Sequence, residues 1–168
     1  MHIFLLGFMG SGKSHWGRLW AAAHNFNFID LDEELEKQEQ KTVAAIFETR
    51  GEDYFRQKET ILLRSLTAQS NSIVSCGGGT PCFFDNMAWM NKNGLTIFLE
   101  ATTQFILKNI KNEKDKRPLI KDKDDAEILF FIEQKLKERQ PYYSKAKIIL
   151  QAEDLNIDSI KKVINLSL

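Results

Sequence analysis

Cysteine is scarce in this chain, since Cys76 and Cys82 are the only two among 168 residues. No third or fourth cysteine or histidine stands near them at the spacing of a zinc site, so we do not expect a zinc centre. Two isolated thiols in a chain without an export signal are typical of a reducing compartment. We therefore expect free cysteines and a cytoplasmic protein.

An excess of either charge is also lacking, because 23 Lys and Arg residues balance 23 Asp and Glu residues. A chain without net charge has no overall field that would draw it to nucleic acid or anionic lipid, so any anion site must be local. No apolar run reaches membrane-spanning length, and the opening residues lack a basic leader. We expect one monomeric globular domain over residues 1–168, with no nucleic-acid or membrane partner.

A glycine-rich segment near the start carries the strongest functional signal. Residues 7–14 read GFMGSGKS, which fits G-x-x-x-x-G-K-[ST], and the apolar residues 3–6 precede them. A strand, a tight glycine turn and a helix form a phosphate-binding loop, whose backbone N–H groups and helix dipole face the anion. Lys13 is then predicted to reach the β- and γ-phosphates, and the Ser14 hydroxyl to bind Mg²⁺. The alternative is a glycine turn with an incidental lysine.

Strand-like and helix-like segments alternate along the chain. We predict strands at residues 3–6, 26–31, 72–75, 95–99 and 148–150, and helices at 13–23, 33–69, 86–92, 103–110, 125–140 and 157–164. Breaks are expected within the second helical segment, near Lys41-Thr42 and at Gly51, and Pro141 is expected to stop the helix before it. This order predicts an α/β fold, a three-layer α/β/α sandwich around a five-stranded, mainly parallel sheet.

Polar and small residues follow the second and third predicted strands, at the edge where ligands bind in such sheets. Asp30 and Asp32 end the second strand two residues apart, so we expect their carboxylates to point the same way. One would suit Mg²⁺ and the other an acceptor hydroxyl, although Asp32 is also a candidate N-cap for the next helix. Gly77, Gly78 and Gly79 would let the backbone approach a ligand, or would form a flexible turn.

The stretch 111–125 is the most charged part of the chain, because eleven of its fifteen residues are Lys, Arg, Asp or Glu. A solvated loop and a mobile lid that closes over a nucleotide both fit this composition. A lid would serve a kinase, which must exclude water from the γ-phosphate.

Arg56 and Arg139 would each be read alone as surface charges. Together with the other motifs, however, they make the chain resemble the shikimate kinase family over nearly its whole length. The motifs occur in the family's order and at its spacing: LLGFMGSGKS at 5–14, Gly17-Arg18, FIDLD at 28–32, Ile46-Phe47, Gly51-Glu52, Phe55-Arg56 with Glu59, GGGT at 77–80, Arg117-Pro118-Leu119 and Arg139-Gln140-Pro141.

The resemblance implies a P-loop kinase of the nucleoside monophosphate kinase type, with substrate-binding helices at about 33–60 and a lid at about 111–125. It implies in-line transfer of the γ-phosphoryl group of ATP to the 3-hydroxyl of shikimate, with Mg²⁺, in chorismate and aromatic amino acid biosynthesis. Such transition states are loose, so positioning and charge neutralisation should matter more than base strength.

The resemblance also implies a role for each matching residue. ATP would be held by Gly10, Ser11, Gly12, Lys13, Ser14, His15 and Arg117, and Mg²⁺ by Ser14 with Asp30. Shikimate would be held by Asp32, Arg56, Gly77, Gly78, Gly79 and Arg139, with the two arginines clamping its carboxylate. The catalytic residues would be Lys13, Asp32 and Arg117, with Asp32 orienting the 3-hydroxyl or accepting its proton.

The chain departs from the family pattern at a few positions. His15 stands where relatives usually have threonine. Ile110 stands where they tend to have an arginine that stacks on adenine, which leaves recognition of the base open. After Arg139-Gln140-Pro141, relatives usually show Leu-Tyr and later Ala-Asp, whereas this chain has Tyr142-Tyr143 and Ala146-Lys147.

Two other functions remain open at this point. The first is another small-molecule kinase on the same scaffold, acting on gluconate or a nucleotide. The second is a kinase-like module that binds without catalysis. Such a module would be expected to have lost a phosphate-loop, metal or acceptor residue, and the chain has kept them.

Overall fold

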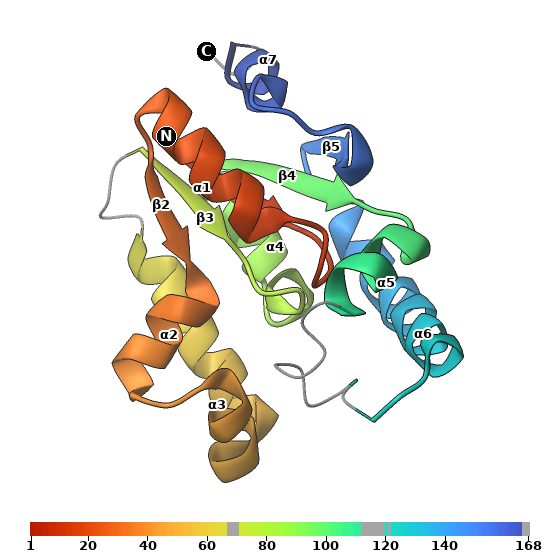
Figure 1. The fold of residues 1–168 in the computed structure, drawn as a ribbon. Coiled ribbons are helices and arrows are strands. Elements are labelled where there is room, and N and C mark those ends of the chain that lie inside the picture. The colour runs from red at the N-terminus through yellow and green to blue at the C-terminus, as the bar shows by residue number, and fades with distance from the viewer. Residues whose placement is uncertain (67–70, 112–119, 121, 166–168) are drawn as a thin grey trace.

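The computed structural model describes residues 1–66, 71–111, 120 and 122–165, and its centre is a five-stranded sheet (Figure 1). The strands lie in the order β2-β3-β1-β4-β5, and each neighbouring pair is parallel. Their bounds are β1 His2–Leu6, β2 Asn27–Asp30, β3 Ser72–Ser75, β4 Leu95–Glu100 and β5 Ile148–Gln151. The predicted α/β fold with a parallel sheet is confirmed.

Helices cover both faces of this sheet, as expected of parallel strands whose central members β1, β3 and β4 are largely buried. On one face, Trp20 of α1 packs with Ile3 and Leu5 of β1, in a cluster that extends to α7. On the other, Phe4 and Leu6 pack with residues of α3 and α4. Figure 1 shows α1 in front of the sheet and α4 behind it. The helix bounds are α1 Lys13–His24, α2 Leu31–Glu39, α3 Val43–Ser65, α4 Asn86–Asn93, α5 Thr103–Lys111, α6 Asp125–Tyr143 and α7 Ser159–Asn165, with short 3₁₀ turns η2 Thr80–Cys82 and η4 Ala152–Asp154.

A third apolar cluster joins α5 and α6 to the loop after β1. Phe8 of that loop packs with Ile106 and Ile110 of α5 and with Ile128 and Ile132 of α6. The glycine-rich loop is thus anchored by Phe8 in an apolar cluster that it shares with α5 and α6. No helix in the described part of the chain is long and apolar enough to cross a membrane.

The strand order also fixes where a ligand can bind. From β1 the chain passes to β2, returns to β3, and then crosses β1 to reach β4 and β5. The connections after β1 and β3 therefore run to opposite sides, and ligands in open α/β sheets bind at the crevice that such a reversal leaves. Residues 7–12 and 76–79 follow these two strands, so they border this crevice.

The prediction that Asp30 and Asp32 both end a strand is wrong, because β2 ends at Asp30 and Asp32 lies in the first turn of α2. Asp30 is the N-cap instead of Asp32, and its Oδ1 accepts hydrogen bonds from the backbone N–H of Asp32 at 3.1 Å and of Glu33 at 3.4 Å. Capping satisfies N–H groups that have no partner within the helix, which is why the chain turns helical two residues earlier than predicted.

The prediction that Pro141 stops its helix is also wrong, since α6 continues to Tyr143. Proline removes one N–H donor and crowds the carbonyl four residues earlier, but little helix remains beyond this position. Tyr143 is completely buried, and the N–H of Ser144 still bonds the Gln140 carbonyl at 3.0 Å. Packing of the last turn outweighs the local cost of the proline.

The two breaks expected within 33–69 are confirmed. The helix α2 ends at Glu39, and Thr42 caps α3 by accepting a hydrogen bond from the Ala45 N–H at 3.2 Å. Within α3, Gly51 has φ 81° and ψ 171°, which is not helical and kinks the segment. Residues 67–69 of the predicted segment lie outside the described residues.

Candidate active site

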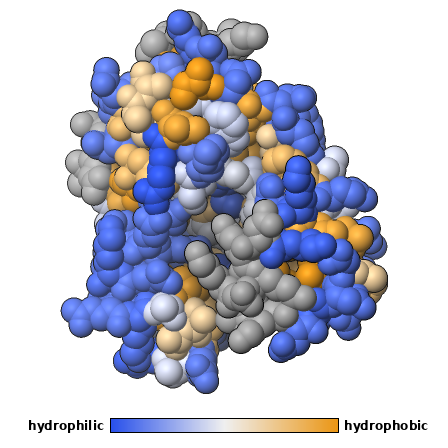
Figure 2. All heavy atoms as spheres, viewed as in Figure 1, coloured by the Kyte–Doolittle hydropathy of each residue, from blue (hydrophilic) through white to orange (hydrophobic). Residues whose placement is uncertain are grey.

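A cavity of about 710 Å³ opens at the crevice between the loops after β1 and β3. That volume is within the range of cofactor and substrate pockets. Figure 2 shows a mainly hydrophilic face with a hollow near its centre. The cavity is lined by Met9, Gly10, Gly12, Lys13, Ser14, His15, Trp16, Asp30, Asp32, Ser75, Cys76, Gly77, Gly78, Phe105, Asn109, Ala152, Glu153 and Leu155.

The loop after β1 has the conformation that the glycine pattern predicts. Gly10 and Gly12 have φ values of 79° and 91°, which side chains with a Cβ rarely adopt. A Cβ on Gly10 would also lie 2.7 Å from the Ile110 side chain. Because α1 begins at Lys13, the N-terminal end of its dipole points to this loop. The arrangement is that of an anion cradle built from main-chain amides.

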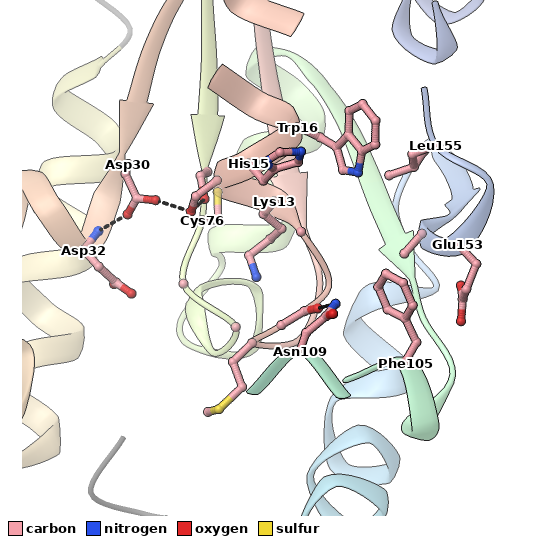
Figure 3. Close-up of a pocket in the computed structure, with 18 residues that line it drawn as sticks. Lys13, His15, Trp16, Asp30, Asp32, Cys76, Phe105, Asn109, Glu153 and Leu155 are labelled. Carbon is pink, nitrogen blue, oxygen red and sulfur yellow. Dashed lines mark hydrogen bonds between the residues drawn. The ribbon is translucent and has the colours of Figure 1, made fainter. Parts of the chain in front are cut away.

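The Lys13 side chain extends across the glycine-rich loop toward the end of β1. Its Nζ donates hydrogen bonds to the carbonyl oxygens of Gly7 and Phe8, both at 2.9 Å. Burial lowers its pKa from 10.5 to about 8, and the charges of Asp32 and Asp30 partly oppose this shift. Figure 3 shows the side chain pointing into the cavity, between the two aspartates on one side and Asn109 on the other. The ammonium group is therefore positioned for a ligand in the cradle.

Three oxygen-bearing side chains meet beside Lys13, at the ends of β2 and β3 and the start of α1. The Ser14 hydroxyl donates to Asp30 Oδ2 at 2.5 Å and lies 3.1 Å from the Ser75 hydroxyl. Hydroxyl and carboxylate oxygens are ligands for Mg²⁺. Among the described residues, no group of three or more His, Cys, Asp or Glu could hold a metal ion by itself. Water and phosphate oxygens would complete the coordination of an ion here.

Asp32 enters the cavity from the first turn of α2 (Figure 3). Burial, followed by repulsion from Asp30 and Glu59, raises its pKa from 3.8 to about 6. A carboxylate with this pKa is mostly ionised at pH 7, yet it is more basic than an exposed aspartate. It can therefore accept a hydrogen bond from an alcohol, or take its proton.

Arg56 lies against the last of the three glycines and is already paired. It donates to Glu59 Oε2 at 2.9 Å and to Glu52 Oε1 at 3.2 Å, and Glu59 also accepts a 2.5 Å bond from Thr80. The guanidinium of Arg56 is 2.5 Å from the point where Gly79 would carry a Cβ. Any larger residue at position 79 would displace it.

Arg139 lies against the middle glycine, and its surroundings differ. Its Nη1 is 2.7 Å from the Cβ position of Gly78, and its Cζ is 5.3 Å from the centre of the Phe8 ring. Within the described residues it forms no ion pair with an acidic side chain. Of the two arginines at the glycine run, it is therefore the one without an acidic partner in the part of the chain that the structure describes.

The structure thus gathers most, but not all, of the predicted site residues in one cavity. Ser11, Gly79, Arg56 and Arg139 do not line it; Ser11 is buried within the loop, and the other three meet at the glycine run beside it. The predicted residue Arg117, and the predicted lid except residues 111, 120 and 122–125, lie outside the described residues.

Sequence reasoning missed a second wall of the cavity, formed by Trp16, Phe105, Asn109, Glu153 and Leu155 (Figure 3). Trp16 also stacks on Trp20 of the same helix. The others come from segments that carry no motif, so only the fold brings them together. Asn109 donates a 2.7 Å bond to the Gly10 carbonyl, while its neighbour Ile110 is buried. Ile110 is therefore a core residue, and Asn109 faces the cavity.

Comparison with known proteins agrees with the geometry. The family model for shikimate kinase matches residues 9–166. The shikimate kinase of Phocaeicola vulgatus is 42% identical over 171 residues, covering 97% of this chain and 98% of that protein. The crystal structure of shikimate kinase from Bacteroides thetaiotaomicron superposes with a TM-score of 0.93 at 38% identity, covering 99% and 98% of the two chains.

A third likeness is to a structure that contains a bound ligand. Shikimate kinase from Acinetobacter baumannii in complex with shikimate has a TM-score of 0.84 and 29% identity, covering 99% of this chain and 92% of that one. The family match, the identity over nearly the full length and the shared fold agree with one another. This chain belongs to the shikimate kinase family.

Proposed function

We propose that this protein transfers the γ-phosphoryl group of ATP to the 3-hydroxyl of shikimate, giving shikimate 3-phosphate and ADP. The observation that carries this proposal is the meeting of two sites at one crevice. Lys13 and the amides of residues 10–14 form an anion cradle, and the glycine run beside it borders two guanidinium groups. A phosphate donor and a small carboxylic acid can therefore bind next to each other.

The acceptor binds through its carboxylate and its ring hydroxyls. Arg139 and Arg56 hold the carboxylate, because a planar guanidinium matches a carboxylate in a two-point hydrogen bond. Asp32 faces the 3-hydroxyl, orients it for in-line attack and takes up its proton as the new P–O bond forms. Gly77, Gly78 and Gly79 let the ring approach the backbone, since side chains there would meet Glu59, Arg139 and Arg56.

The donor is held by the loop and by Lys13. Lys13 exchanges its bonds to the Gly7 and Phe8 carbonyls for the β- and γ-phosphates, with Gly10, Ser11, Gly12, Ser14 and His15 around them. Ser14 is the Mg²⁺ ligand and Asp30 supports the ion through water, which fits the close approach of their oxygens. When bound, Mg²⁺ neutralises charge on the β- and γ-phosphates. The family resemblance also assigns Arg117, which lies outside the described residues, to the phosphates.

We further propose that the protein acts as a single-domain monomer in the cytoplasm. This proposal is supported by the balanced charge of the chain, by two cysteines that are both free, and by the apolar clusters that join all the strands to helices. Size-exclusion chromatography with light scattering tests the monomer, and a mass twice the expected 19.4 kDa would contradict it.

ADP release from ATP with Mg²⁺, measured with and without shikimate, tests the activity. We expect turnover that depends on shikimate, and no comparable turnover with gluconate or nucleoside monophosphates in its place. Lys13→Ala should lower kcat by about a thousandfold, because it removes a charge that stabilises the transferred group, while the circular dichroism spectrum stays that of the wild type. Shikimate-independent turnover, or near-normal activity of Lys13→Ala, would contradict the proposal.

A further inference from the structure

Tyr143 is a buried residue that none of the proposed binding steps uses. It lies at the end of α6 with 0% of its surface exposed, and its ring stacks on Phe98 of β4 with centroids 4.8 Å apart. Its hydroxyl donates a 2.6 Å hydrogen bond to the carbonyl oxygen of Gly78. A side chain of the last helical turn is thus bonded directly to the middle glycine of the acceptor site.

Arg139 also contacts Gly78, the middle glycine of the proposed acceptor site. The Cβ position of Gly78 lies 2.7 Å from Arg139 Nη1 and 3.5 Å from the Tyr143 hydroxyl, so both side chains contact one face of it. Residues four apart on a helix lie on one face, one turn above the other. Because α6 continues through Pro141, Arg139 and Tyr143 keep this relation.

Arg139 needs such a support more than Arg56 does. Glu52 and Glu59 hold the guanidinium of Arg56 on two sides. Arg139 has no acidic partner within the described residues, and it lies against the Phe8 ring and the Gly78 backbone. The Gly78 backbone and the neighbouring Tyr143 hydroxyl are therefore the polar groups that can fix where the Arg139 charge lies.

We propose that Tyr143 is a positioning residue for the acceptor, whose hydroxyl fixes the Gly78 carbonyl and thereby the place at which Arg139 meets the carboxylate. The proposal rests on the proposed function, because it assigns Arg139 to the acceptor. Burial raises the pKa of Tyr143 above its usual value of 10, with the Arg139 charge opposing the shift, so the hydroxyl stays protonated and remains a donor.

Tyr143→Phe tests the proposal, because it removes only the hydroxyl and keeps the ring on Phe98. Losing one hydrogen bond to a buried partner is worth about a tenfold change in an equilibrium. We expect the KM for shikimate to rise by about tenfold, with the KM for ATP and kcat within about twofold of wild type. Tyr142→Phe is the matched control, since it removes a hydroxyl from the adjacent tyrosine, and should leave both KM values unchanged.

A double variant shows whether the effect passes through Arg139. If Tyr143 acts by positioning that side chain, Tyr143→Phe should raise the shikimate KM no further in an Arg139→Ala background. Gly78→Ala disturbs the contact between Gly78 and Arg139 directly, because the new methyl group would displace the Arg139 side chain. It should therefore also raise the KM for shikimate more than the KM for ATP. Circular dichroism and the melting temperature check that each variant is folded.

Three results would overturn the positioning role. The first two are unchanged KM values in Tyr143→Phe and an equal rise in the KM for both substrates. The third is a double variant whose shikimate KM rises by the product of the increases seen in Tyr143→Phe and Arg139→Ala. A variant that only melts at a lower temperature gives Tyr143 a structural role alone, and so also contradicts the proposal. Failure of the proposed function looks different, because the wild type itself would then show no shikimate-dependent turnover.

Discussion

Individual residues in this site differ mainly in how their charge is compensated. Arg56 is paired with two glutamates before any ligand binds, whereas Arg139 contacts an aromatic ring and a glycine. Lys13 and Asp32 are both buried enough for their pKa values to move toward neutrality, to about 8 and about 6. Small changes at these four positions should therefore have large and distinguishable effects.

Arg139→Ala should weaken binding of the acceptor shikimate much more than binding of the donor ATP. A charged two-point hydrogen bond to a carboxylate is worth about 2–3 kcal/mol, so the KM for shikimate should rise by roughly 30- to 150-fold. The KM for ATP should stay within about twofold. Initial rates with each substrate varied in turn measure both values, and Lys137→Ala, an exposed cation on the same helix, is the control. Equal rises in both KM values would count against the carboxylate clamp.

Asp32→Asn should stabilise the protein while it removes activity. A carboxyl group whose pKa is raised on folding binds more protons in the folded state between pH 6 and pH 4, so its contribution to stability rises as the pH falls across that window. Above pH 6 the buried carboxylate costs about 1–3 kcal/mol, which the neutral amide avoids. Wild-type activity should instead fall as the pH drops through about 6, because Asp32 is then protonated.

Melting temperatures measured from pH 4 to pH 8 check this sign. The Asp32→Asn variant should melt higher than the wild type at pH 8, and the difference should shrink toward pH 4. Gln38→Ala, a change at an exposed uncharged residue of the same helix, should show no such trend. A wild type that melts as high as the variant at pH 8 would mean that Asp32 carries no burial penalty.

At the scale of elements, α3 depends on a residue that is not helical. Gly51 has φ 81° and ψ 171°, and a Cβ there would meet nothing within 4 Å. The cost of Gly51→Ala is therefore purely one of backbone conformation, about 1–3 kcal/mol. We expect a lower melting temperature, whereas Glu48→Ala on the exposed surface of the same helix should be nearly neutral. An unchanged melting temperature in Gly51→Ala would show that the kink is not required.

The elements also show what a sequence can predict. The β1 strand, the glycine loop and the helix break at Gly51 follow from local patterns, because apolar runs and glycine act on their own neighbours. The end of β2 and the course of α6 were predicted wrongly, since a capping bond from Asp30 and the burial of Tyr143 decide them. The contacts of the two arginines with Gly78 and Gly79 needed the fold, because they join segments far apart in the chain.

At the scale of the whole molecule, the site draws on the loops that follow β1, β2 and β3 and on α5 and η4. A ligand that joins these elements should stabilise the entire fold. At a hundred times its dissociation constant, ATP with Mg²⁺ adds about 2.7 kcal/mol, which raises the melting temperature of a chain of this size by roughly 5–10 °C. Calorimetry should show one cooperative transition, as expected of a single domain.

Comparing ATP with shikimate, in the wild type and in Lys13→Ala, shows which site causes each rise in melting temperature. Shikimate alone should also raise the melting temperature. Lys13→Ala should abolish the response to ATP and keep the response to shikimate, because we assign Lys13 to the donor alone. Two separate transitions, or an ATP response that survives in Lys13→Ala, would contradict this coupling.

The unequal pairing of the two arginines has a consequence for selectivity by charge. Glu52 and Glu59 hold the guanidinium of Arg56, whereas Arg139 has no acidic partner among the described residues. The carboxylate of a monoanion can therefore pair with Arg139. A dicarboxylate of similar size would bring a second negative charge toward Asp32, whose pKa is already raised by burial and by repulsion from Asp30 and Glu59. We therefore expect the pocket to select its acid by valence as well as by shape.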